Sequence, residues 1–152
     1  MRSMAMSDPA EVTQAKLLIV DDKTANLDLL RDMLAPLGHQ IFFATSGAKA
    51  LSIAASVLPD LVLLDVEMPV LCGPKVLQAM KSDPGLAHIP VIMISAITDD
   101  EIIHQCLELG ADDYIAKPYN ATLLQARINP LIKIKRMADL EKTQNERLSD
   151  LA

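Results

Sequence analysis

Short apolar runs alternate with stretches of helical periodicity along this chain, and that alternation constrains the fold more than any other feature. Continuous apolar runs of this kind are typical of strands that are buried on both faces of a sheet. The predicted strands are Lys16–Val20, Gln40–Ala44, Leu61–Leu64, Val91–Ile94 and Asp113–Ala116. Five strand–helix units in succession predict a parallel sheet with helices covering both of its faces.

Helix signals occupy the segments between these strands. Four leucines recur at helical spacing after the first strand, and a glycine follows them as a stop signal: Leu27, Leu30, Leu34, Leu37 and Gly38. Ser46 is the predicted N-cap of the next helix. Thr98 and Glu101 have the spacing of a capping box, which predicts a helix that begins at Thr98.

Composition excludes several classes of protein. The chain has 152 residues, enough for one domain and an appendage. Hydrophobic residues at 51 % exclude wholesale disorder, and 3 % aromatics with a net charge of −6 argue against a nucleic-acid reader. Cys72 and Cys106 lack metal-ligand spacing, which argues against a zinc site and fits a reducing compartment. No run spans a membrane and no signal peptide is evident, so we expect a cytoplasmic protein with a flexible leader over residues 1–15.

Polar residues follow four of the predicted strands at the point where each strand ends. Asp21 and Asp22 follow the first strand, Asp65 the third, Ser95 the fourth and Lys117 the fifth. Ligands of open parallel sheets bind beyond the carboxyl ends of the strands, so these side chains are expected to share one edge. Each of them alone is more often a turn, cap or loop residue, and the joint placement carries the prediction.

Three carboxylates in one place repel one another unless a cation is present, and an all-oxygen site suits Mg²⁺. A carboxylate can also attack phosphorus and form an acyl phosphate. A lysine and a hydroxyl would then hold the phosphoryl oxygens. The residues therefore predict phosphoryl-transfer chemistry at Asp65.

Four stretches together resemble the receiver domain of two-component response regulators: LLIVDD (17–22), PDLVLLDVEMPVLCG (59–73), IPVIMISA (89–96) and GADDYIAKPY (110–119). The resemblance covers residues 16–130. It implies a flavodoxin-like, doubly wound sheet of five parallel strands in the order 2-1-3-4-5. Residues 131–152 would form an extended C-terminal helix or a linker toward an output domain.

Position by position, the resemblance implies a role for each acidic residue of the site. Asp65 would be the phosphoacceptor. Asp22 would bind Mg²⁺ directly and Asp21 more through water. Asp65 and the backbone carbonyl of Glu67 would complete the metal shell.

The remaining roles concern phosphate binding and switching. The resemblance implies that Lys117 pairs with the phosphoryl group, and that the Lys117–Pro118 bond is cis. Ser95 would be the switch hydroxyl and Tyr114 the switch aromatic. The sequence departs from the family at Cys72, where relatives often have Asp. Glu67 also places an extra acidic side chain beside Asp65.

The function implied is two-component phosphorelay signalling. A histidine kinase or histidine phosphotransfer protein would supply the phosphoryl group, and the domain would catalyse only its own phosphorylation and dephosphorylation. No direct contact with nucleic acid or membrane is expected. Two rival interpretations remain: a pseudo-receiver that docks partners without phosphorylation, and a flavodoxin-like or phosphatase-type enzyme. The lack of a Gly-rich loop after the first strand argues against the second. The first is opposed by the intact set of Asp21, Asp22, Asp65, Ser95 and Lys117.

The C-terminal part differs in kind. Residues 120–152 contain no Gly and one Pro, which predicts a helix that Pro130 kinks or breaks. Side chains at steps of three and four form a seam with a polar middle: Ile134, Met137, Glu141, Gln144, Leu148 and Leu151. The segment is either a solvated helical extension, or a signalling helix that forms a weak homodimer or leads to a further domain.

Overall fold

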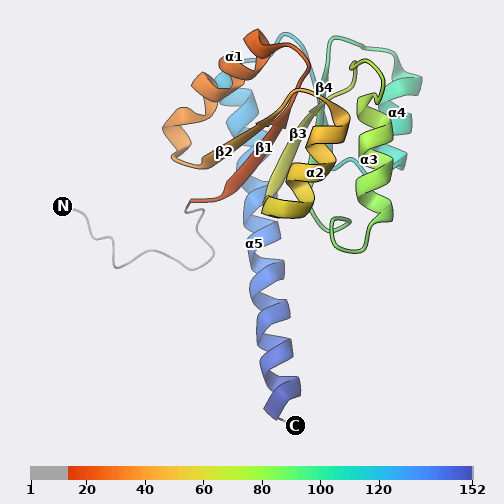
Figure 1. Ribbon diagram of the computed structural model, residues 1–152. Helices are drawn as coiled ribbons and strands as arrows, with labels where there is room; N and C mark the ends of the chain where they lie inside the picture. Colours follow the sequence, from red (N-terminus) through yellow and green to blue (C-terminus); the bar gives the residue numbers. More distant parts are fainter. Residues whose placement is uncertain (1–13, 152) are drawn as a thin grey trace, which may run out of the picture.

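The computed structural model describes the backbone of residues 14–151 and side chains through Leu148. It shows a five-stranded parallel sheet in the order β2-β1-β3-β4-β5 (Figure 1). The strands are β1 (Lys16–Val20), β2 (Gln40–Ala44), β3 (Leu61–Asp65), β4 (Val91–Ser95) and β5 (Asp113–Ala116). The helices are α1 (Thr24–Leu34), the 3₁₀ turn η2 (Ala35–Leu37), α2 (Gly47–Val57), α3 (Gly73–Ser82), α4 (Asp100–Glu108) and α5 (Ala121–Leu151). The predicted fold and strand order are confirmed.

Two hydrophobic cores lie on opposite faces of the sheet, because successive side chains of a strand point to opposite faces. Helices α2, α3 and α4 cover one face, where Leu18, Val62 and Met93 are buried. Helices α1 and α5 cover the other face, where Leu17, Leu63 and Ile92 are buried (Figure 1). With both faces covered, the chemistry is confined to the edges where the strands end.

The helix ends match the sequence signals with one exception. The Ser46 side chain accepts a hydrogen bond from the backbone N–H of Lys49, at 3.2 Å, as an N-cap does. The predicted cap at Thr98 is wrong by one residue: Asp99 is the N-cap of α4, and its side chain accepts from the N–H of Glu101 at 2.9 Å. An Asp side-chain oxygen caps as well as a Thr oxygen does, and Asp99 lies directly before the first residue of the helix.

Helix α5 is continuous and leaves the body of the molecule as a stalk (Figure 1). Pro130 lies inside the helix, so the alternative that it breaks the helix is wrong. Ile132 is fully buried beyond that point, and Lys135 forms an ion pair with Asp60 at 3.6 Å. These contacts stabilise the turn that follows Pro130 and offset its missing N–H.

None of the helices in the described part of the chain is both long enough and apolar enough to cross a lipid bilayer.

Candidate functional site

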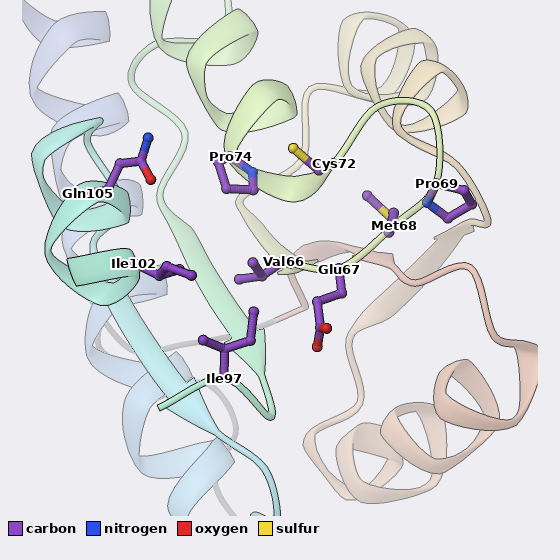
Figure 2. A pocket seen from close by; sticks show the side chains of 9 residues that line it. All are labelled: Val66, Glu67, Met68, Pro69, Cys72, Pro74, Ile97, Ile102 and Gln105. Carbon is purple, nitrogen blue, oxygen red and sulfur yellow. The ribbon is translucent and has the colours of Figure 1, made fainter. Parts of the chain in front are cut away.

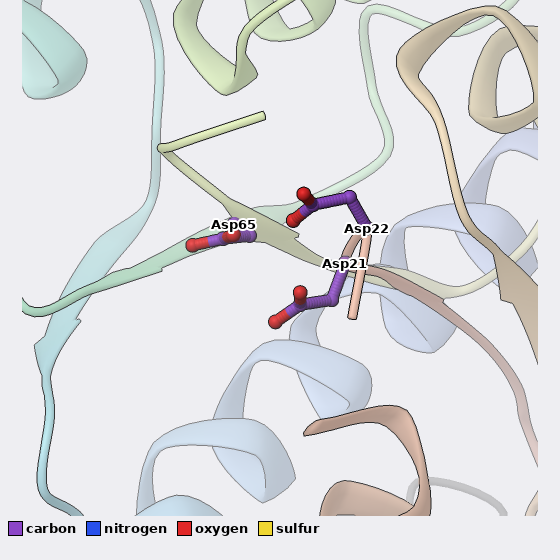
Figure 3. A group of neighbouring side chains, drawn as sticks. All are labelled: Asp21, Asp22 and Asp65. Carbon is purple, nitrogen blue, oxygen red and sulfur yellow. The ribbon is translucent and has the colours of Figure 1, made fainter. Parts of the chain in front are cut away.

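Three carboxylates meet at the carboxyl edge of the sheet (Figure 3). Asp21 and Asp22 directly follow β1, and Asp65 is the last residue of the neighbouring strand β3. Val20 of β1 pairs with Leu64 of β3, so the register places the acidic residues side by side. Each residue offers a carboxylate oxygen within 4.8 Å of the others. The sheet register alone therefore brings together three negative charges.

The three carboxylates differ in their hydrogen bonds. Asp21 is buried and accepts from the backbone N–H of Lys23 at 2.9 Å and from the side-chain amide of Asn26 at 3.0 Å. By contrast, Oδ1 of Asp22 and Oδ1 of Asp65 are buried and have no hydrogen-bond partner among the described residues. Buried carboxylate oxygens without donors are costly unless a cation or another ligand neutralises them.

Lys117 supplies the positive charge of the site from the end of β5. Its Nζ lies 3.7 Å from Oδ1 of Asp65 and 3.8 Å from Oδ2 of Asp21. Both distances exceed that of a direct hydrogen bond, so the ammonium faces the two carboxylates without donating a hydrogen bond to either one. The Lys117–Pro118 peptide bond is cis, as the resemblance implied.

Ser95, at the end of β4, is fully buried beside the acidic residues. Its Oγ lies 3.4 Å from Oε1 of Glu67 and accepts from the backbone N–H of Ile97 at 3.0 Å. The Tyr114 hydroxyl donates to the carbonyl of Ile97 at 2.8 Å, and burial raises the pKa of this phenol. The Ser95 hydroxyl and the Tyr114 hydroxyl therefore both bind the backbone of Ile97, in the loop between β4 and α4.

All site residues predicted from the sequence are within this cluster or adjoin it, and three neighbours were missed. Asn26 holds Asp21 from the first turn of α1. Burial and the nearby Asp21 raise the pKa of Tyr119 to about 12. Gly73 packs against the backbone of Asp65. Gly73 and Tyr119 carried a signal, since each ends a stretch quoted above, at 59–73 and 110–119, whereas Asn26 lies outside those stretches.

Asp65, the predicted phosphoacceptor, has a strongly raised pKa. Burial, followed by the Asp21 carboxylate, raises its pKa from 3.8 to about 6, against the opposing effect of Lys117. A raised carboxyl pKa means that the folded chain disfavours the charged form. Burial and, secondarily, repulsion by Asp21 therefore penalise the negative charge of Asp65, and a bound cation would offset this penalty.

The raised pKa of Asp65 predicts a pH-dependent stability. In the unfolded chain Asp65 ionises near its ordinary pKa of about 4, whereas the folded chain keeps the proton until about pH 6. Stability therefore falls as pH rises through that window and stays lowered above it. Without added metal, we expect Asp65→Asn to exceed the native chain by about 2 kcal/mol in the free energy of unfolding near neutral pH, and by close to zero at about pH 4.

Urea unfolding at several pH values measures this difference. Asp28→Asn is the matched control, because the Asp28 side chain is 63 % exposed on α1. An Asp65→Asn advantage that is larger at acidic than at neutral pH would contradict the assigned sign.

The donor set fits Mg²⁺ and no softer metal. All three groups are carboxylates, and Asp22 and Asp65 each keep a buried oxygen without a donor. Mg²⁺ prefers oxygen ligands and is commonly held by one or two carboxylates, with water completing its shell. The residues present therefore fit this ion.

The comparisons with known proteins agree with this geometry. Residues 17–129 match the response regulator receiver domain family. The response regulator PleD of Caulobacter vibrioides is 40 % identical over 125 residues, covering 82 % of this chain and 28 % of PleD. The sensor histidine kinase TmoS of Ectopseudomonas mendocina is 34 % identical over 140 residues, covering 91 % of this chain and 14 % of TmoS.

A solved structure extends the comparison to the metal site. The receiver domain of the sensor histidine kinase PA1611 from Pseudomonas aeruginosa is 27 % identical, with a TM-score of 0.73 over 79 % of this chain and 98 % of that one. That receiver domain holds a magnesium ion in its active-site cleft. Family match, fold and acidic edge lead to one conclusion: the chain belongs to the response regulator receiver domains of two-component signalling.

Proposed function

We propose that Asp65 accepts a phosphoryl group from a phosphohistidine donor. One observation carries the proposal: a buried carboxylate with an unpartnered oxygen faces Lys117 at 3.7 Å and lies beside two further carboxylates. In the transfer, the O–P bond to Asp65 forms as the P–N bond of the donor breaks. The electron pair of that bond stays with the imidazole nitrogen, which leaves as neutral imidazole once it holds a proton.

Asp22, Asp65 and the backbone carbonyl of Glu67 would bind Mg²⁺ directly, and Asp21 would bind it through water. When bound, the ion would neutralise charge on the phosphoryl oxygens. The chain's own residues do the rest. Lys117 offsets negative charge on the same oxygens, and Asn26 fixes the orientation of Asp21. The burial of Asp65 limits the access of water to it.

The two acidic residues after β1 are expected to contribute unequally to metal binding. Asp22→Ala removes an oxygen that has no other partner, whereas both oxygens of Asp21 already accept hydrogen bonds. We therefore expect Asp22→Ala to weaken Mg²⁺ binding by about tenfold, and Asp21→Ala by less. Titration calorimetry measures both affinities, and an unchanged affinity in Asp22→Ala would refute the direct ligand.

Ser95 and Tyr114 are proposed to report the phosphoryl group to the surface. A phosphoryl oxygen on Asp65 attracts the Ser95 hydroxyl, which now lies near Glu67. The Ile97 N–H loses its present acceptor when that hydroxyl moves, and the Tyr114 ring can turn into the vacated space. The surface formed by α4, β5 and α5 then changes, and a partner can distinguish the two states.

The function is tested by incubating the full chain with phosphoramidate and Mg²⁺. A gain of one phosphoryl mass that is lost on omitting Mg²⁺ supports it. An unmodified chain would favour the pseudo-receiver alternative, which keeps the fold and not the chemistry. Turnover of free phosphate esters, or bound flavin absorbance, would favour the enzyme alternative.

The chain spans less than a third of PleD and of TmoS. We propose that this receiver domain acts on an output domain or partner protein through α5. The helix packs on the sheet as far as Ile132 and then projects from the body (Figure 1). A shift of α5 on the sheet is thereby carried along the stalk.

The stalk is further proposed to pair weakly with that of a second copy. Ile134, Met137 and Leu148 are exposed at seam positions, and the Leu151 side chain lies outside the described part. Glu141 and Gln144 occupy the middle of the seam, where burial of a charge opposes pairing. The result is a concentration-dependent dimer.

Leu148→Glu tests this pairing. The Leu148 side chain is 65 % exposed, so the substitution costs the single chain little, but it places a second acidic layer in the seam. We expect the dissociation constant of the dimer, measured by sedimentation equilibrium, to rise by about tenfold. Leu107→Glu on α4, which is also exposed, is the control and leaves the dimer unchanged. A native chain that stays monomeric at its highest soluble concentration contradicts the pairing.

A further inference from the structure

Val70, in the loop between β3 and α3, is both the most exposed large hydrophobic residue described and a conformational outlier. Its relative exposure is 107 %, against 65 % for the next, Leu148. Its φ is +68°, a conformation that β-branched residues rarely adopt. The N–H of Leu71 donates to the carbonyl of Pro69 at 2.8 Å, which closes a γ-turn around Val70. Strain of this kind persists only where the surroundings impose it, and it is concentrated at functional sites.

The loop that carries Val70 is anchored on the phosphoacceptor. The N–H of Gly73 donates to the carbonyl of Val66 at 3.0 Å and closes the loop at its base. Gly73 also packs so tightly on Asp65 that a Cβ there would lie 2.2 Å from the Asp65 carbonyl oxygen. Val70 is five residues from Asp65, the last residue of β3, so it stays within about 18 Å of the strand end. A fixed apolar side chain therefore projects from the rim of the site.

A glycine at position 70 would relieve the strain and remove an exposed apolar side chain at once. Folding and solubility therefore do not account for valine at this position. Binding does, because an apolar group that is already held in one conformation loses little freedom when a partner covers it.

The occupant follows from the burial of Asp65. The Asp65 side chain is 7 % exposed, so the phosphohistidine must be inserted past the rim, and the protein surface around that histidine must rest on the rim loops. An apolar cleft of about 500 Å³ lies between the same loop and α4, lined by Met68, Pro69, Ile97 and Ile102 among others (Figure 2). A donor with apolar side chains beside its histidine fits this surface.

We propose that Val70 is a docking contact for the protein that donates the phosphoryl group, and so a determinant of donor specificity. The inference rests on the proposed function of Asp65. It assigns Val70 no part in the chemistry, so phosphorylation by a small donor does not depend on it.

Val70→Gly and its matched control Leu58→Gly test the proposal. Leu58 also has a positive φ, +53°, and is 55 % exposed, but it caps α2 at the opposite edge of the sheet. Each full-length variant is phosphorylated by phosphoramidate with Mg²⁺. Each is also phosphorylated by radiolabelled, autophosphorylated histidine-kinase cores, using the core in a panel that transfers fastest to the native chain. Val70→Gly is expected to lose about tenfold in kcat/KM with the kinase core, mainly through KM, and less than about twofold with phosphoramidate.

A second variant separates the side chain from the loop. Asn adopts positive φ readily, so Val70→Asn keeps the turn and removes the apolar contact, and the same loss with the kinase core is expected. An unchanged kinase rate in both variants overturns the proposal, as does an equal loss with both donors. A native chain that accepts phosphate from phosphoramidate and from no kinase core also overturns it. A native chain that phosphoramidate does not modify overturns the proposed function instead.

Discussion

Asp65→Asn is expected to take up no phosphoryl group from phosphoramidate and Mg²⁺, whereas the native chain takes up one. The amide keeps the size of the side chain but loses the negative charge that attacks phosphorus. It also replaces one of the two carboxylate oxygens, leaving a single oxygen as acceptor. Intact mass measures the uptake. Fluorine NMR measures binding of beryllofluoride, whose BeF₃⁻ group stands in for the phosphoryl group on the Asp65 oxygen.

The loss in Asp65→Asn cannot be ascribed to unfolding, because the substitution removes a buried charge whose pKa is raised to about 6. The metal-free variant should be the more stable chain near neutral pH. Asp28→Asn, on the exposed face of α1, should keep native uptake. Equal beryllofluoride binding by Asp65→Asn and the native chain would end the assignment of Asp65 as phosphoacceptor.

The shared edge of the site could be predicted from the sequence because a parallel sheet has only one carboxyl edge. Apolar runs located the strands, and the residue after each run then had to lie at that edge. Asp21, Asp22 and Asp65 meet for this reason, with Lys117 facing them. Strand order decides which of these residues are neighbours, and it came from the family resemblance.

Contacts that depend on packing could not be predicted in this way. Helix α5 continues past Pro130 because Ile132 is buried and Lys135 reaches Asp60, two contacts that no local pattern contains. The Glu67 side chain lies beside Ser95, although only its backbone carbonyl had been assigned a role. The strained turn at Val70 is likewise imposed by the loop and not by the preference of valine.

Gly73 shows how closely the fold and the site depend on one another. Helix α3 begins against the end of β3, and a Cβ at position 73 would lie 2.2 Å from the Asp65 carbonyl oxygen and 2.8 Å from Cα of Val66. Both are backbone atoms, so no side chain can turn aside to make room. Gly73→Ala is therefore expected to lower the free energy of unfolding by about 3 kcal/mol and to displace the strand end that carries Asp65.

Gly85→Ala is the matched control, since a Cβ there meets only the Asp83 side chain, at 3.4 Å. The free energy of unfolding of this variant should lie within about 0.5 kcal/mol of the native value. The alanine restricts the unfolded chain, and its Cβ makes no close contact in the folded one. Urea unfolding with an unchanged m-value measures both variants. Without urea, and at a temperature where both variants are folded, the rate of phosphorylation by phosphoramidate should fall more in Gly73→Ala than in Gly85→Ala. If the two variants unfold alike, helix α3 does not fix the position of Asp65 through this contact, and the backbone of the phosphoacceptor must be held by the strand ladder alone.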